Sequence, residues 1–215
     1  MPTKKTARAR TPKRLSSDAF FDVLRKRTTR NAKQVDKDIE ERSLDDVTVM
    51  MVDSSGFSRK THAYGIIQFL AVMTHCYDKI IPRLEARGGI TLSRNADNIF
   101  AMFEKPDDAI RAAIDMQQWL QKRNIGKPDQ EQYSVCIGIN SGTVVRLADN
   151  VYGDMVNIAA KIGEDLAAKD QILVTKVVAE QVGKKYDIRY DRSVEIGTQM
   201  VEVHEVQYEV PTARS

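Results

Sequence analysis

Two aspartates stand beside segments that have the residue pattern of β-strands. Asp53 follows the largely apolar segment 47–52, and Asp97 precedes the apolar segment 99–103. Short apolar runs bounded by Ser, Asn and Gly predict strands, so two adjacent strands would bring both carboxylates to one rim of a sheet. Mg²⁺ and Mn²⁺ use one or two protein carboxylates and take their other ligands from water and nucleotide phosphates. The pair therefore predicts a site for a hard divalent cation.

The size and composition of the chain allow one well-filled domain with a short appendage. It has 215 residues, of which 42% are hydrophobic. The apolar stretch 65–73 is much shorter than a bilayer span and no apolar signal segment follows the N-terminus, so we expect no membrane span and a cytoplasmic location. Cys76 and Cys136 have no Cys-x-x-Cys or Cys/His spacing, which argues against structural zinc and against a disulfide scaffold.

The positive charge is concentrated at the N-terminus. The net charge is +3, and all the basic residues before the first acid, Asp18, lie in residues 1–14. Such a run can contact nucleic acid or an anionic membrane, but no aromatic residue is interleaved with these charges. We therefore predict that 1–14 is a basic, disordered tail without a stable nucleic-acid partner.

The rest of the chain divides into a helical lead-in at 15–44 and a larger domain at 45–212. Periodicity predicts one helix from Ser17 to about Arg42, which would serve as a lead-in or dimer helix. In the larger domain the predicted elements are a strand at 47–52, a helix from 61 that Pro82 kinks or ends, a strand at 90–92, a turn at 95–98, a strand ending at 103, a helix from 106 to about 120, and a strand at 133–140 that turns at 141–142 into 143–145.

The predicted order βαββαβ, with both helices on one face of the sheet, is the ferredoxin-like arrangement of an α+β fold. In that arrangement the first strand lies beside the central hairpin, which would bring Asp53 and Asp97 together. Additional elements extend this core: a helix at 153–168, a strand at 171–175, a short helix at 175–182 and a terminal β-hairpin that pairs 186–190 with 201–210.

Three separated blocks resemble the catalytic domain of the class III nucleotidyl cyclases, which include the adenylyl and guanylyl cyclases. They are VDSSGFS at 52–58, GG at 88–89 with ADNIFAMF at 96–103, and YGDMVNIAAK at 152–161, and GINSG at 138–142 lies between the second and third. Each block alone is weak. Together, in this order and over about 47–182, they predict the class III cyclase fold.

The resemblance implies a two-metal mechanism with Mn²⁺ or Mg²⁺. Asp53 and Asp97 would hold two ions, with the carbonyl of Ser54 as a further ligand. One ion would activate the ribose 3′-hydroxyl and the other would hold the triphosphate, so that a 3′,5′-cyclic nucleotide forms and pyrophosphate leaves. The glycine-bearing loop from Ser55 to Ser58 leads towards a helix, so its N–H groups, including that of Ser58, can meet phosphate oxygens.

Asn157 and Lys161 are four residues apart and share one face of a predicted helix. The resemblance implies that Asn157 positions the ribose and that Lys161 stands where the family has an arginine for the charge that develops on the phosphates. A lysine supplies the charge without the bidentate fork, which leaves two outcomes open: slower turnover or loss of activity. In family members that pair head to tail, these two residues and the metal aspartates come from opposite protomers. This implies a homodimer with active sites at its interface.

The positions that read the base in purine-specific relatives correspond to Ser93 and Asn150. Neither the lysine–aspartate pair for adenine nor the glutamate-containing guanine set is present. Arg94 offers paired donors to a pyrimidine carbonyl or to the triphosphate, and Phe57 can pack against ribose or base. The chain is thus similar to the bacterial pyrimidine cyclases that act in defence against phage, and UTP before CTP is the expected substrate. An adenylyl or guanylyl cyclase is the alternative.

Two other classes remain open at this point. A non-catalytic nucleotide-binding or regulatory module would explain the lysine at 161 and the departures at 93 and 150, although the retained aspartates argue against it. A nucleic-acid-binding protein with a polymerase-palm-like sheet would explain the basic tail together with the paired carboxylates.

Overall fold

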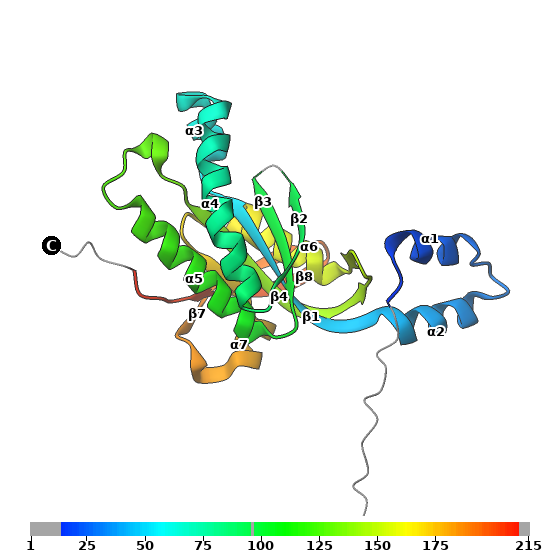
Figure 1. Cartoon of the computed structure of the whole chain (residues 1–215). Helices are drawn as coiled ribbons and strands as arrows, with labels where there is room; N and C mark the ends of the chain where they lie inside the picture. The colour runs from blue at the N-terminus through cyan, green and yellow to red at the C-terminus, as the bar shows by residue number, and fades with distance from the viewer. Residues whose placement is uncertain (1–13, 96, 211–215) are drawn as a thin grey trace, which may run out of the picture. The chain divides into compact units, whose positions relative to one another are not determined.

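The computed structural model of the chain describes residues 14–95 and 97–210 (Figure 1). The predicted disordered tail lies outside these residues except for Arg14. Two compact units are present. Unit 1 contains residues 14–45 and 145–152, and unit 2 contains 46–144 and the segment from 153 onward.

Unit 1 contains two helices and the end of a β-hairpin. Helix α1 is Ser17–Arg25, helix α2 is Ala32–Ser43, and strand β5, Val151–Tyr152, pairs with Val145 and Arg146. The hydroxyl of Ser16 caps α1 by accepting a hydrogen bond from the amide of Ala19. The core of the unit is formed by the buried side chains of Phe20, Ile39 and Leu147.

The prediction of one helix from 17 to about 42 was wrong, because the chain turns between α1 and α2. The side-chain oxygen of Asn31 accepts hydrogen bonds from the amide of Thr28, at 2.6 Å, and from its hydroxyl. Asparagine and β-branched threonines compete with helical hydrogen bonding in this way, which explains the break at 26–31.

Unit 2 is built on a sheet whose strand order is β2-β3-β1-β4-β6-β8-β7. Strand β1 lies between β3 and β4, so the predicted adjacency of the first strand and the central hairpin is confirmed. The strands are β1 Leu44–Ser54, β2 Ile90–Asn95, β3 Asn98–Phe103, β4 Val135–Arg146, β6 Ile172–Thr175, β7 Ile188–Ile196 and β8 Gln199–Val206. The helices are α3 Phe57–Tyr64, α4 Ile66–Ala86, α5 Pro106–Asn124, α6 Asp154–Lys161 and α7 Lys176–Val182; short turns are η1 Asp129–Glu131, η2 Ile162–Leu166 and η3 Gly183–Lys185.

Helices α4 and α5 lie side by side on one face of the sheet (Figure 1). The main core forms between them and the strands, and Met50, Ile99 and Ile137 meet Ile80 and Met116 there, all essentially fully buried. The α+β fold with a ferredoxin-like core is therefore confirmed.

The predicted turn at 141–142 was wrong. Strand β4 is continuous through Ser141 and Gly142, where a turn was predicted. The polar side chains that suggested a turn form buried hydrogen bonds. The Ser141 hydroxyl lies 2.8 Å from that of Thr48, and the side-chain amide of Asn140 donates to the carbonyl of Met155. Of the two effects predicted for Pro82, a kink or the end of its helix, the second does not occur, because α4 continues to Ala86.

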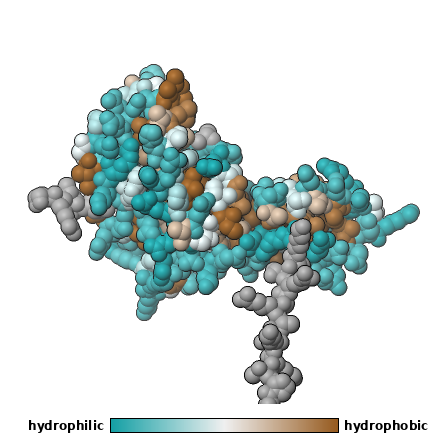
Figure 2. Space-filling model, in the orientation of Figure 1, coloured by the Kyte–Doolittle hydropathy of each residue, from teal (hydrophilic) through white to brown (hydrophobic). Residues whose placement is uncertain are grey.

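Unit 2 has a mostly polar surface in the view of Figure 2, with a brown apolar area over α3 and the start of α4. Ile66, Ile67 and Leu70 are exposed in this region, and Ile67 retains 81% of its accessible surface. None of the helices among the described residues is long and apolar enough to span a bilayer.

Candidate active site

Asp53 and Asp97 are neighbours at one rim of the sheet. Strands β1 and β3 are antiparallel, with Val52 opposite Ile99, so the two aspartates lie just beyond the last paired residues. The hydroxyl of Ser54, which is buried, donates a 2.6 Å hydrogen bond to a carboxylate oxygen of Asp97. The structure thus brings together the three residues that the sequence predicted to surround a metal ion.

The carboxylate of Asp53 has an unusual charge environment. Burial, followed by repulsion from Asp97 and then from Glu164, raises the pKa of Asp53 to about 7. The amide of Ser54 opposes this shift by hydrogen bonding to the carboxylate. None of the largest contributions comes from a cation of the protein. The rim is therefore a half-buried concentration of negative charge that the surrounding side chains do not neutralise.

This arrangement fits a divalent cation. Within 14–95 and 97–210, no group of three or more His, Cys, Asp and Glu side chains is arranged to hold a metal ion. Two carboxylates suffice for Mg²⁺ or Mn²⁺, which keep water and phosphate oxygens as their remaining ligands. The uncompensated charge at Asp53 and Asp97 is the observation that favours such an ion.

The turn after β1 leads from the rim into α3. Gly56 has a φ of 80°, a left-handed conformation that favours glycine, and the amide of Ser55 donates to the carbonyl of Ser134 at 2.9 Å. Ser58 is exposed on the first turn of α3. The ring of Phe57 packs edge-on against Phe69, with 5.0 Å between centroids, so this side chain contributes to the main core.

Asn157 lies on α6 and lines a cavity of about 260 Å³ beside the turn between β7 and β8. The same cavity is lined by Asp154 and by residues 196–199 of that turn. Lys161, one turn further along α6, forms an ion pair with Asp165 of η2. Asn157 and Asp53 are thus found in different surroundings within one chain.

Segment α6–η2 lies against the backbone of the sheet because two glycines permit close approach. A Cβ atom on Gly138 would lie 2.3 Å from the amide nitrogen of Gly163 and 2.5 Å from the carbonyl oxygen of Ala159. A Cβ on Gly163 would in turn lie 3.0 Å from the carbonyl oxygen of Met51. This contact joins η2 to the strand that carries Asp53.

Glu164 and Asp165 are two further acids near the rim, and they were not identified from the sequence. Glu164 accepts a 2.7 Å hydrogen bond from Asn98, which follows Asp97 directly, and both acids raise the pKa of Asp53. Helical spacing only groups Glu164 with Asn157 and Lys161, so it gave no signal for the place of Glu164 beside Asn98, which follows from the π-helical turn η2.

Ser93 and Arg94 are placed on opposite faces of β2. Ser93 is opposite Phe100, which pairs with Met51, so Ser93 is on the face of the sheet that carries Asp53. Arg94 is opposite Ile99 and therefore on the face covered by α4. A cavity of about 550 Å³ adjoins this edge, lined by Ile81, Glu85, Thr91, Leu92, Ser93 and Arg94.

Asn150 belongs to unit 1, in the turn between β4 and β5. Its side-chain oxygen accepts a hydrogen bond from the amide of Val151 at 2.9 Å, and its amide group donates to the hydroxyl of Tyr152 at 3.2 Å. The side chain of Asn150 therefore stabilises the turn between β4 and β5.

Comparisons with known proteins point to one family. The sequence profile described as the adenylate and guanylate cyclase catalytic domain matches residues 39–207. The serine/threonine-protein kinase pkn2 of Myxococcus xanthus is 25% identical over 137 residues, which are 61% of this chain and 16% of that protein. The putative adenylate cyclase 3 of Rhizobium meliloti (strain 1021) is 23% identical over 142 residues, which are 66% of this chain and 24% of that protein.

The chain thus spans a quarter or less of the length of these curated relatives. Among solved structures, an adenylate/guanylate cyclase/hydrolase from Silicibacter pomeroyi superposes with a TM-score of 0.66 at 24% identity, covering 79% of this chain and 99% of that one. This similarity supports the fold.

Proposed function

Because the chain belongs to the family of adenylate and guanylate cyclase catalytic domains, we propose that it is a nucleotidyl cyclase. It would convert a nucleoside triphosphate into a 3′,5′-cyclic nucleotide and pyrophosphate. The observation that carries this proposal is the uncompensated pair Asp53 and Asp97 at the rim of the sheet. In this reaction the ribose 3′-oxygen bonds to the α-phosphorus, the bond to the β-phosphate oxygen breaks, and the hydroxyl proton leaves to solvent.

The rim residues would hold Mn²⁺ or Mg²⁺ ions, two per site. When bound, these ions supply positive charge that acidifies the 3′-hydroxyl and neutralises the triphosphate. Asp53 and Asp97 provide the carboxylates, and the Ser54 carbonyl is a further ligand. The Ser54 hydroxyl fixes the orientation of Asp97 through its 2.6 Å hydrogen bond. The N–H groups of Gly56, Phe57 and Ser58 in the turn after β1 bind phosphate oxygens, while that of Ser55 is bonded to the carbonyl of Ser134.

The second half of each site would come from another copy of the chain, in a homodimer. Asn157 would position the ribose and Lys161 would stabilise charge on the phosphates. Two observations support this division: Asn157 lines the cavity beside the β7–β8 turn, and the largest charge effects on Asp53, after burial, come from Asp97 and Glu164.

Mixing two inactive variants tests the shared site. Asp53→Ala and Asn157→Ala should each be inactive alone. When the two are mixed and pair at random, half of the dimers are heterodimers, and each heterodimer has one intact site and one defective site. The mixture should therefore reach about a quarter of wild-type activity. If the mixture stays inactive although the chains exchange, the two residues act within one chain.

The favoured substrate is a pyrimidine nucleoside triphosphate, UTP before CTP. Support comes from Ser93 and Asn150, which lack the charged groups that purine-specific relatives use at these positions, and from the resemblance to bacterial pyrimidine cyclases. A second-messenger role in defence against phage rests on the same resemblance. If ATP or GTP is cyclised fastest instead, the chain is an adenylyl or guanylyl cyclase.

A product assay with each of the four ribonucleoside triphosphates tests the proposal directly. The pure protein is incubated with Mn²⁺ and one nucleotide at a time, and cyclic product and pyrophosphate are identified by mass spectrometry. Absence of every cyclic product at several pH values and with both metals would contradict a cyclase.

A catalytically weak nucleotide-binding regulatory module is the second candidate. The observation that favours it is the ion pair between Lys161 and Asp165, which engages the lysine that the resemblance assigns to the charge developing on the phosphates. Nucleotide binding without pyrophosphate release would support this candidate, and rapid turnover would exclude it.

A further inference from the structure

Helix α3, which follows the phosphate-binding turn, lies between two glycines. It has eight residues, and it begins after Gly56 and ends at Gly65, whose φ angles are 80° and 85°. Among the described residues, no side chain caps its N-terminal end. The direction of α3, and with it the conformation of the preceding turn, is therefore not fixed by continuous helix or strand on either side.

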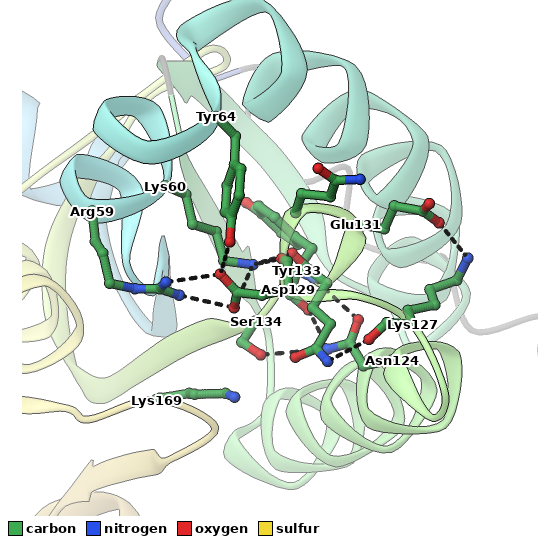
Figure 3. A network of polar contacts seen from close by, with 12 residues as sticks. Arg59, Lys60, Tyr64, Asn124, Lys127, Asp129, Glu131, Tyr133, Ser134 and Lys169 are labelled. Carbon is green, nitrogen blue, oxygen red and sulfur yellow. Dashed lines mark hydrogen bonds and ion pairs between the residues drawn. The ribbon is translucent and has the colours of Figure 1, made fainter.

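A cluster of charged residues fixes α3 to another part of the chain. Asp129 of η1 accepts two hydrogen bonds from the guanidinium of Arg59, at 2.8 and 3.0 Å, and one from the hydroxyl of Tyr64 at 3.1 Å. The ammonium group of Lys60 donates to the carbonyls of Asp129 and Gln132, and Lys60 is only 8% exposed. Figure 3 shows these side chains converging on Asp129. We call Arg59, Lys60, Tyr64 and Asp129 the α3 clasp.

The segment that carries Asp129 is itself held firmly. The side chain of Asn124 bonds both the amide and the carbonyl of Tyr133, at 3.1 and 2.8 Å, and Arg123 donates to the carbonyl of Glu131 at 2.6 Å. These bonds are drawn in part in Figure 3. The segment 129–134 can therefore serve as a fixed support for α3.

This segment contacts the phosphate-binding turn on both sides of Gly56. Before Gly56, the carbonyl of Ser134 accepts a hydrogen bond from the backbone amide of Ser55. After Gly56, Asp129 accepts hydrogen bonds from the side chains of Arg59 and Lys60. The turn is thus held at two points by one support. Since N–H groups bind phosphate only when they point to a common centre, loosening either point should weaken the site.

We propose that Asp129 is a positioning residue, which acts through Arg59 and Lys60 to hold the Ser55–Ser58 turn in the conformation that receives the triphosphate. This inference rests on the proposed function, because it assigns the turn to phosphate binding. Asp129 does not touch the reacting atoms. The role requires its charge, because a neutral group cannot hold the two-pronged hydrogen bond of Arg59 equally well.

The test compares Asp129→Asn with a matched variant, Asp115→Asn. Asp115 also accepts from an arginine, Arg87, at 2.6 and 2.7 Å, and it has similar exposure, but it joins α4 to α5 away from the turn. Binding of inorganic tripolyphosphate with Mn²⁺ is measured by calorimetry. We expect Kd to rise about tenfold in Asp129→Asn and to stay within about twofold in Asp115→Asn.

Kinetics separate a positioning role from a general loss of structure. In Asp129→Asn we expect KM for the nucleotide to rise about tenfold with kcat within about threefold of wild type, because the turn holds phosphate before and during the reaction. Arg59→Lys, which keeps the charge and loses the fork, should show a smaller rise in KM. Amide hydrogen exchange of 55–64 should quicken only in the clasp variants.

Several outcomes overturn the proposal: equal tripolyphosphate affinity in the two aspartate variants, a fall in kcat without a change in KM, or no tripolyphosphate binding by the wild type. Tighter binding by Asp129→Asn would also overturn it, since the freed Arg59 would then contact phosphate itself. If the wild type cyclises none of the four nucleotides, the proposed function fails, and the tripolyphosphate comparison still decides the role of Asp129.

Discussion

Asp53 and Asp129 are both partly exposed aspartates of unit 2, and their surroundings shift their acidity in opposite directions. The carboxylate of Asp53 is surrounded by burial and by other acids, which raise its pKa to about 7. Hydrogen bonds from Arg59 and Tyr64 hold the pKa of Asp129 well below its usual range. The second carboxylate is neutralised by the protein, whereas the first needs a cation from outside.

This difference separates a binding site from a structural contact. An uncompensated pair of carboxylates costs stability in the folded chain, and such a cost is typical of positions that are maintained for function. A carboxylate with three donors stabilises a local conformation and has little capacity left for a further ligand.

The largest effect is expected from Asp53→Ala, which removes the carboxylate at the centre of the acidic rim. Losing several kcal/mol of charge stabilisation lowers kcat by about 1000-fold. Because a repulsive charge is removed, the metal-free variant should melt no lower than wild type. The measurement combines a cyclase assay with thermal unfolding, and Asp115→Asn is the control. Wild-type turnover in Asp53→Ala would contradict the assigned role.

Gly138→Ala disturbs the rim without changing any of its acids. The new methyl would collide with backbone atoms of Ala159 and Gly163, so the free energy of unfolding should fall by about 1–3 kcal/mol. Urea denaturation measures the change. Gly142→Ala, on the same strand, meets only the Met155 side chain at 3.6 Å and should be nearly neutral. Equal stability of the two variants would show that η2 can move away from β4 at little cost.

The metal-free protein should lose thermal stability as the pH rises. The folded pKa of Asp53, about 7, lies above the unfolded value of about 4, so the folded state binds the proton more tightly. The cost of ionising Asp53, which comes first from burial and then from repulsion, is absent below about pH 4 and complete above about pH 7, which gives a decline of a few degrees between these values after solvent screening. Saturating Mn²⁺ and the variant Asp53→Asn should each remove the decline. A melting temperature of the metal-free wild type that does not change between pH 4 and pH 7 would contradict the predicted decline.

Glu164→Gln should have the smallest effect. It removes one of the charges that act on Asp53 and leaves the proposed metal ligands Asp53, Ser54 and Asp97 in place. Exposed charge interactions contribute about 0.2–1 kcal/mol, so the affinity for Mn²⁺ should fall by less than about threefold. Titration calorimetry measures it, with Glu180→Gln on α7 as the control. A loss as large as that of Asp53→Ala would make Glu164 a metal ligand.

The fold and the centre of the candidate site were predictable because both depend on local apolar patterns. The apolar runs at 47–52 and 99–103 predicted two buried strands. Because the predicted βαββαβ order makes these strands neighbours, it also placed Asp53 beside Asp97. The break between α1 and α2 and the continuity of β4 at Ser141 were missed, because hydrogen bonds of polar side chains decided them.

The α3 clasp could not be read from the sequence for another reason. Arg59 and Asp129 are 70 residues apart, and each looks like a solvated surface charge in its own segment. Only the packing of the connection after α5 against α3 brings them together. Glu164 was missed similarly, since the π-helical turn η2 redirects the end of α6 towards Asn98.

The separate surroundings of Asn157 and Asp53 within one chain have a consequence for output in the cell. If each reaction centre draws on two copies, the rate per chain depends on how many chains have met, and it rises with concentration until association is complete. At low abundance most chains would be unpaired and therefore inactive. A modest increase in expression would then raise signal production more steeply than in direct proportion.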